Sequence, residues 1–494
     1  MTGFRPRLTR PARAPRDPAR PAQAPGLRAQ LSELFRLSIP IIIANFSYAL
    51  LGVTDTIMSG MAGKADLSGV AIGNAFYVPA FVFLQGMVGA MQPLIGRHRG
   101  AGALHAIPRT HLVTLLSVLC LALVMMSILA LIVCFAPAFG EQDMDDIARG
   151  YMIYIIFCIP FMGLFFTLKA YCEAMAHPRA TLFFGLVSLL LNVPLNYIFI
   201  FGALGVPAMG GVGCGTATLV AVIITTLGFA AYILAHSQLR PYSLFAASGG
   251  AGGAQVRDYL RLSLPLGLSA SVESSCFTLI AMLLAPFGSL VVASHSIVMS
   301  IASFLYTIPL SIGIAVSIMV GYAIGERHGG HLRDTIRAAY HAAFINTALS
   351  MLIIGACNLH LVRIYTTDEE VVACAALLLA VAFCNLPVEN LQTVQAFVLR
   401  GFKDNRYIFA VTVAAFYVVS LLLGTLLSYG LLPLPQSLGQ ALEGAPGFWV
   451  GLFLGLATAA ICYRLRLIRH LHDVSAGKLE AAEAGGGRQG GSGP

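Results

Sequence analysis

Long apolar stretches separated by short polar turns dominate the pattern of hydrophobic and polar positions along this chain of 494 residues. A helix needs about 20 consecutive apolar residues to cross the hydrocarbon core of a bilayer, and each stretch is long enough. The pattern therefore predicts an all-α polytopic membrane protein with twelve transmembrane helices. The predicted spans are 34–60, 67–96, 109–136, 147–175, 180–202, 211–236, 258–286, 288–322, 334–365, 370–399, 406–432 and 446–470.

The composition agrees with this pattern and excludes a soluble enzyme attached to an anchor. Hydrophobic residues make up 57% of the chain and charged residues 11%, against about 25% charged in soluble domains. The ten cysteines are scattered, without a C-x-x-C pair or a metal-ligand spacing. No nucleophile–base constellation is present either. We therefore expect no enzymatic activity, no disulfide framework and no bound cofactor.

The basic residues predict the orientation in the membrane. All of the 30 Lys and Arg residues except Lys64, Arg149 and Arg363 fall in the tails or in the connections on one side. Because positive charges favour the cytoplasmic side, this bias predicts a multi-pass protein of the inner (plasma) membrane with both termini in the cytoplasm. The net charge of +8 is explained by topology. We therefore expect the lipid bilayer, and not nucleic acid, as the partner of these charges.

An internal repeat divides the chain into two similar halves. LFRLSIP at 34–40 matches YLRLSLP at 259–265, and at the same offset Gly96 matches Gly321 and Gly100 matches Gly325. Each half holds six predicted spans in the same orientation, which is typical of transporters with parallel repeats around a central cleft. We expect two rigid lobes that rock in alternating access, and not a channel, since no selectivity segment is seen. The predicted regions are a disordered basic cytoplasmic tail (1–30), the N-lobe (31–236), an interlobe linker (237–257), the C-lobe (258–473) and a disordered tail (474–494).

Three carboxylates fall well inside predicted spans: Asp55, Glu273 and Glu389. A charged group at that depth costs at least ~2.5 kcal/mol, so each is a candidate for binding a coupling ion. Pro387 frees a backbone carbonyl beside Glu389, and oxygen ligands of this kind suit Na⁺. Glu273 and Glu389 are therefore candidate Na⁺ ligands. Burial also favours the protonated form of a carboxyl group, so H⁺ is an equal alternative, and the residues alone do not decide between the two ions.

A second polar cluster is predicted around Asp55. Asn192 and Asn196 lie four residues apart on one helix face, with Thr218 as a weaker candidate on the next span. The alternative is that the two asparagines only hold helices together.

Aromatic and methionine side chains near these spans are candidates for a substrate cleft, because such surfaces adapt to varied ligands and aromatic faces attract cations. Many such residues in a membrane bundle face lipid or each other instead. The candidates are Tyr48, Tyr77, Phe277, Met282, Met299, Phe304 and Tyr306.

Segments from both halves resemble the multidrug and toxic compound extrusion (MATE) transporters of the NorM-like branch. They are VTDTIMSGMAGKADLSGVAIGNAF, QPLIGRHRGAG, LLNVPLNYIFIFG, LPLGLSASVESSCFTLIAMLLAPFG, IPLSIGIAVSIMVGYAIGE and LQTVQAFVLRGFKDNR. The resemblance implies export of organic, often aromatic, cations by exchange with Na⁺ or H⁺, and we expect a functional monomer. It also implies coupling roles for Asp55, Glu273 and position 389, which is usually Asp in this branch and is Glu here. Asn192 and Asn196 match the N-lobe polar cluster of the family.

The sequence leaves two rival functions open and contains one irregularity. A lipid-linked saccharide flippase would need a cationic cleft, whereas the deep charges here are negative. A membrane sensor or scaffold without transport would not need three deep carboxylates. The irregularity is Glu173, which stands where the second half has Arg400. The sequence offers no physical reason for this reversal of charge.

Overall fold

The computed structural model describes residues 26–135, 142–247, 250, 252–327 and 329–476. Within them, twelve helical segments are long and apolar enough to cross a membrane, which confirms the predicted fold class. The first half contains α1 (Leu27–Ala62), α2 (Lys64–Val88), α3 (Met91–Gly100), α4 (Ile107–Phe135), α5 (Gln142–Ala174), α6 (Pro178–Phe201) and α7 (Gly211–Ala235). The second half contains α8 (Gly253–Leu283), α9 (Ser289–Gly325), α10 (Gly329–Arg363), α11 (Glu369–Gly401), α12 (Asn405–Val413), α13 (Leu422–Ser428), α14 (Gln436–Leu442) and α15 (Ala445–Ser475).

The predicted tails and linker differ from the described structure at their edges. Most of 1–30 and of 474–494 lies outside the described residues, but α1 already begins at Leu27 and α15 ends at Ser475. The linker contains two short 3₁₀ turns, Arg240–Tyr242 and Leu244–Ala246. It is held against the first half, because the backbone N–H of Leu244 donates to Nδ1 of His111 at 3.1 Å. The composition of the linker, rich in Gly and Ala, did not predict this attachment.

Two spans predicted as single helices are irregular. The second is broken at Gly89 and Ala90, between α2 and α3. The eleventh passes through a π-helical stretch, Ala414–Leu421, between α12 and α13. The neighbouring α15 presents Gly455 to this stretch, and a side chain there would meet Ser420. The glycine leaves room for the wider π turn.

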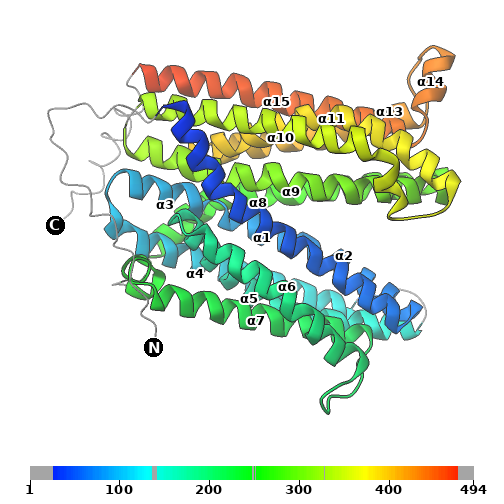
Figure 1. Ribbon diagram of the computed structural model, residues 1–494, viewed down its shortest axis with the longest axis horizontal. Helices are drawn as coiled ribbons and strands as arrows, with labels where there is room; N and C mark the ends of the chain where they lie inside the picture. Colours follow the sequence, from blue (N-terminus) through cyan, green and yellow to red (C-terminus); the bar gives the residue numbers. More distant parts are fainter. Residues whose placement is uncertain (1–25, 136–141, 248–249, 251, 328, 477–494) are drawn as a thin grey trace, which may run out of the picture.

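The two halves of the sequence form the two sides of the bundle, with their helices running roughly side by side (Figure 1). The start of α1 and the end of α15 lie at one end, which we call the terminal end. Thr335 at the start of α10 donates to Oε1 of Gln30 at 3.2 Å, and Arg333 donates to Ser475 at 2.7 Å. Both termini of the described helical bundle therefore lie on the same side, as an even number of spans requires.

A pair of glycines on each of α3 and α9 joins the two halves at the terminal end. These are Gly96 and Gly100 on α3, and Gly321 and Gly325 on α9. A Cβ atom at Gly321 would collide with the backbone oxygen of Pro93, and a Cβ atom at Gly96 would collide with that of Ile318. These two contacts are related by the sequence repeat. The repeated glycines thus form a symmetric crossing of backbones at which the lobes are in close contact.

The loop after α11 fixes the end of that helix against α15. Arg466 and His470 of α15 both bond to Oδ2 of Asp404, at 2.5 and 2.9 Å. Burial would raise the pKa of Asp404, but the hydrogen bonds from His470 and Arg466 outweigh burial and hold the pKa below its usual range.

The neighbouring residue of the same loop, Lys403, is influenced by the other half. Burial and the charge of Arg97 lower the pKa of Lys403 to about 8. Lys403 therefore lies within electrostatic range of Arg97 in the other half.

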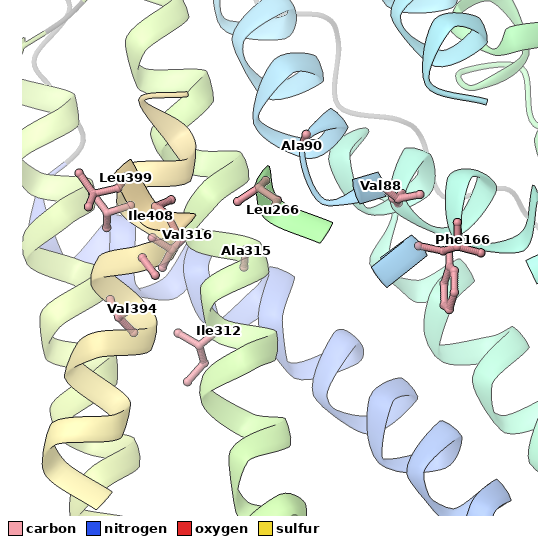
Figure 2. Close-up of a cluster of buried hydrophobic side chains, with 14 of the residues drawn as sticks. Val88, Ala90, Phe166, Leu266, Ile312, Ala315, Val316, Val394, Leu399 and Ile408 are labelled. Carbon is pink, nitrogen blue, oxygen red and sulfur yellow. The ribbon is translucent and has the colours of Figure 1, made fainter. Parts of the chain in front are cut away.

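The apolar core is continuous between the two halves. Figure 2 shows Val88 and Phe166 of the first half near Leu266 of α8, with Ile312 and Val394 of the second half beyond it. All five side chains are buried. Burial of apolar surface thus stabilises the contact between the lobes as well as each lobe.

Candidate functional site

A cavity of about 410 Å³ lies between the two halves of the bundle. Its walls come from α2, α3 and α5 on one side and from α8, α9, α10, α11, α12 and α15 on the other. Most of the lining is apolar, but five Lys, Arg or Glu side chains contribute to it: Lys169, Glu173, Glu273, Glu389 and Arg400. A mostly apolar cleft with a few placed charges is the usual form of a site for a small organic molecule.

Glu273 of α8 and Glu389 of α11 line this cavity, as the candidate site requires. The hydroxyl group of Tyr306 donates to Oε1 of Glu273 at 3.4 Å. Within the described residues, Glu389 accepts no hydrogen bond, although it interacts electrostatically with Glu273. Further oxygen atoms of the same wall belong to Asn385 and Gln392. Two half-buried carboxylates with neutral oxygens nearby make a region that attracts a cation.

Asp55 forms a separate polar cluster inside the first half and does not line the cavity. Its Oδ1 accepts hydrogen bonds from Asn192 at 3.0 Å and from Asn196 at 2.6 Å, and its Oδ2 accepts one from Thr218 at 3.5 Å. The structure therefore brings together the four residues of the second predicted cluster. Asn196 also donates to Asn192 at 3.1 Å, so both asparagines are oriented toward the carboxylate. Their spacing of four residues on α6 produces this geometry.

A buried ion pair in the cavity wall was not recognised from the sequence. Lys169 and Glu173 lie one turn apart on α5, with 3.7 Å between Nζ and Oε1, and both are less than 5% exposed. Lys169 was counted among the charges that set the orientation at the cytoplasmic edge, and this interpretation is wrong. Their separation of four residues inside the predicted span 147–175 was the available signal. Glu173 is a fourth deep carboxylate beside the three predicted ones.

The ion pair is part of a hydrogen-bond network that reaches the other half. Gln92 donates to Oε2 of Glu173 at 2.7 Å, and Lys169 donates to Oδ1 of Asn45 at 2.9 Å. Asn45 in turn donates to Ser311 of α9 at 3.0 Å. Lys169 also lies 5.2 Å from the ring centre of Tyr48, a cation–π contact. The pair is therefore surrounded by partners that compensate for its burial.

Replacing Lys169 by Met should destabilise the protein, because Glu173 would keep a buried charge without its counter-ion. Removing one partner of a buried pair typically costs about 3–5 kcal/mol. We expect a lower midpoint of thermal unfolding in detergent. The double variant Lys169→Met with Glu173→Gln removes both charges and should recover much of the loss. A single variant as stable as the unmodified protein would contradict the importance of the pair.

The predicted aromatic and methionine residues do not form one surface. Phe277, Met299 and Tyr306 line the cavity. The other four lie outside it: Tyr77 bonds to the sulfur of Met162, Phe304 stacks on Phe46, Met282 is 67% exposed, and Tyr48 lies over Lys169. The cavity is also lined by four aromatic residues that were not on the predicted list and belong to other spans: Phe166, Phe397, Trp449 and Tyr463.

No group of three or more His, Cys, Asp or Glu side chains suited to a metal ion is found in the described part of the chain. A Na⁺ ion at Glu273 and Glu389 would therefore need neutral oxygens as well. Asn385, Gln392 and Thr393 supply such oxygens in the same cavity wall.

The sequence is similar to a known family over both halves. The model of the MatE family matches residues 40–198 and 265–426, one segment in each half of the repeat. The chain is 32% identical to the probable multidrug resistance protein NorM of Shewanella oneidensis over 439 residues, which are 89% of this chain and 94% of the relative. It is also 32% identical to the multidrug resistance protein NorM of Vibrio cholerae, with 89% and 95% covered.

Solved structures share the fold at lower identity. The eukaryotic MATE transporter AtDTX14 superposes with a TM-score of 0.79 at 18% identity, covering 91% of this chain and 99% of that one. A multidrug resistance MATE family transporter in an outward-facing conformation gives a TM-score of 0.78, also at 18% identity, with 91% and 97% covered. At these identities the comparison concerns the arrangement of helices and not the site.

Proposed function

This chain belongs to the MATE transporter family, in its NorM-like branch, and we propose that it exports organic cations in exchange for Na⁺ or H⁺. The observation that carries the substrate class is the pair of half-buried carboxylates, Glu273 and Glu389, in an apolar cavity with aromatic walls. The relatives are named for multidrug resistance, which supports a small-molecule cargo of varied shape.

The entry of the ion would be coupled to the release of the substrate because both compete for the same negative charge. A Na⁺ ion or a proton that enters the cavity would neutralise Glu273 or Glu389 and weaken the attraction for a bound organic cation. In a cleft of low dielectric constant this attraction is stronger than in water, so the competition is effective. The lobes would then turn to the other side and release the ion. Asp55 with Asn192, Asn196 and Thr218 is a second candidate position for the coupling proton or ion.

The direction of transport depends on the orientation of the terminal end. We propose that this end faces the cytoplasm, since the Lys and Arg residues of the connections gather there. The contact of α3 with α9 then closes the cytoplasmic side. In this arrangement the cavity would be reached from the outer side, where a substrate leaves and a coupling ion enters.

Efflux of ethidium from proteoliposomes tests the proposal. We expect dye transport when a Na⁺ gradient or a pH gradient is imposed alone, and protein-free liposomes provide the control for leakage. Transport with the Na⁺ gradient only would make the carboxylates Na⁺ ligands, and transport with the pH gradient only would make them proton carriers. If neither gradient moves the dye, the proposed exchange of a cation is wrong.

A further inference from the structure

The charges of the cavity can be counted from its lining. Two positive and three negative side chains contribute, and Lys169 and Glu173 form a pair with 3.7 Å between their charged atoms. This pair neutralises itself. The remaining charges are those of Glu273, Glu389 and Arg400, so the cavity with all groups ionised has a net charge of −1.

Arg400 is a fixed charge that no neighbour neutralises by direct contact. It lies one residue before the end of α11, and its guanidinium group is 4.0 Å from the ring centre of Phe397. Its Nε is buried and has no hydrogen-bond partner among the described residues. It makes no ion pair with any of them, although it interacts with Glu273 at longer range. A buried donor without a partner costs free energy, so this arrangement needs an explanation.

The position of Arg400 is also supported from the other half. The break between α2 and α3 brings Gly89 to the guanidinium group, and a Cβ atom at Gly89 would be 3.0 Å from Nη1 of Arg400. Gly89 and Arg400 both line the cavity. The positive charge therefore lies at the contact between the lobes, in the same space as the two carboxylates.

We propose that Arg400 sets the charge capacity of the cavity to a single positive charge. With Arg400 present, two carboxylates and one guanidinium attract either one coupling ion or one monovalent organic cation. A second positive charge in the same space would be repelled by Arg400 without an unpaired carboxylate to compensate it. Arg400 thus makes the coupling ion and the substrate mutually exclusive and disfavours divalent organic cations. This inference rests on the proposed function, because it concerns the substrates of the same cavity.

The difference in charge between Glu173 and Arg400, at equivalent positions of the two repeats, affects the charge of the cavity. Glu173 and Arg400 occupy equivalent positions of the two halves, and both line the cavity. Glu173 is paired with Lys169 and contributes no net charge, whereas Arg400 contributes a full positive charge. Without a charge at position 400 the cavity would have a net charge of −2 from Glu273 and Glu389, and Arg400 reduces it to −1.

Ethidium and propidium provide a direct test, because they share one aromatic ring system and carry one and two positive charges. We expect the unmodified protein in proteoliposomes to export ethidium faster than propidium. In Arg400→Gln the ratio of the two rates should fall by roughly tenfold, which corresponds to about 1.4 kcal/mol. Arg400→Lys keeps the charge but not the stacking geometry on Phe397, and should keep the ratio of the unmodified protein.

A second measurement follows the competition itself. Ethidium binding to the purified protein should be displaced by the coupling ion in the unmodified protein and in Arg400→Lys, but only weakly in Arg400→Gln. An unchanged ethidium-to-propidium ratio and unchanged competition in a folded Arg400→Gln variant would overturn the inference. If the unmodified protein moves neither dye under any gradient, the proposed function fails instead. Melting curves of all three proteins distinguish these results from misfolding.

Discussion

Replacing Glu273 by Gln is expected to abolish gradient-driven ethidium export while the protein remains folded. Gln keeps the size of the side chain and can still pair with the hydroxyl group of Tyr306, which lies 3.4 Å from Oε1. What is lost is the negative charge that attracts both the substrate and the coupling ion. Loss of one charge from a buried, attracting pair costs about 2–5 kcal/mol, which corresponds to a loss of roughly thirtyfold or more.

The measurement is the initial rate of ethidium efflux from proteoliposomes under the gradient that drives the unmodified protein. Glu443→Gln is a matched control, because it makes the same chemical change at an exposed carboxylate before α15. We expect this control to keep the full rate. A Glu273→Gln variant that transports at the rate of the control would contradict a role of this carboxylate in coupling. Equal melting temperatures of the two variants would exclude unfolding as the cause.

The fold could be predicted from the sequence because a bilayer leaves few alternatives. Every backbone polar group inside the membrane must be bonded, so an apolar stretch of sufficient length forms a helix. The twelve predicted spans are confirmed for this reason. The break at Gly89 and the π-helical turn at Ala414–Leu421 were not predicted, because both depend on which helix packs against the segment.

The parts of the candidate site that could be predicted are those in which the spacing of residues along one helix determines which side chains lie together. Asn192 and Asn196 reach Asp55 because residues four apart share a helix face. Lys169 and Arg400 were missed for the opposite reason. A Lys or Arg near a predicted helix end is counted as cytoplasmic, but the last turns of α5 and α11 form part of the cavity wall, so Lys169 and Arg400 line the cavity. Only the packing of the two halves distinguishes a basic side chain at the cytoplasmic edge from one that lines the cavity.

The repeat explains which features were predictable and which were not. Glycines at the crossing of α3 and α9 are the same in both halves, because close contact of two backbones requires them. The charges differ, since Tyr48 and Met162 stand in the first half where the second has Glu273 and Glu389. The common fold depends on the repeated glycines, whereas the chemistry of the cavity depends on residues in which the halves have diverged.

Replacing Gly321 by Ala is expected to weaken the contact between α3 and α9 and to reduce transport strongly. The added Cβ atom would collide with the backbone oxygen of Pro93, which cannot move aside as a flexible side chain does. Overpacking of this kind typically costs about 1–3 kcal/mol. The cost falls on the conformation in which the terminal end is closed, so the lobes should separate there more often.

The effect of an alanine substitution on stability distinguishes Gly321 at this crossing from an ordinary glycine within a helix. Gly52 lies inside α1 with no atom within 4 Å of its Cβ position, so Gly52→Ala should be neutral or stabilise the protein by up to about 1 kcal/mol. Spin labels at the exposed positions His105 and Arg333, one in each half, would report the separation. We expect a longer distance in Gly321→Ala and not in Gly52→Ala. Equal distances and equal transport in the two variants would mean that the lobes do not use this crossing to close the terminal end.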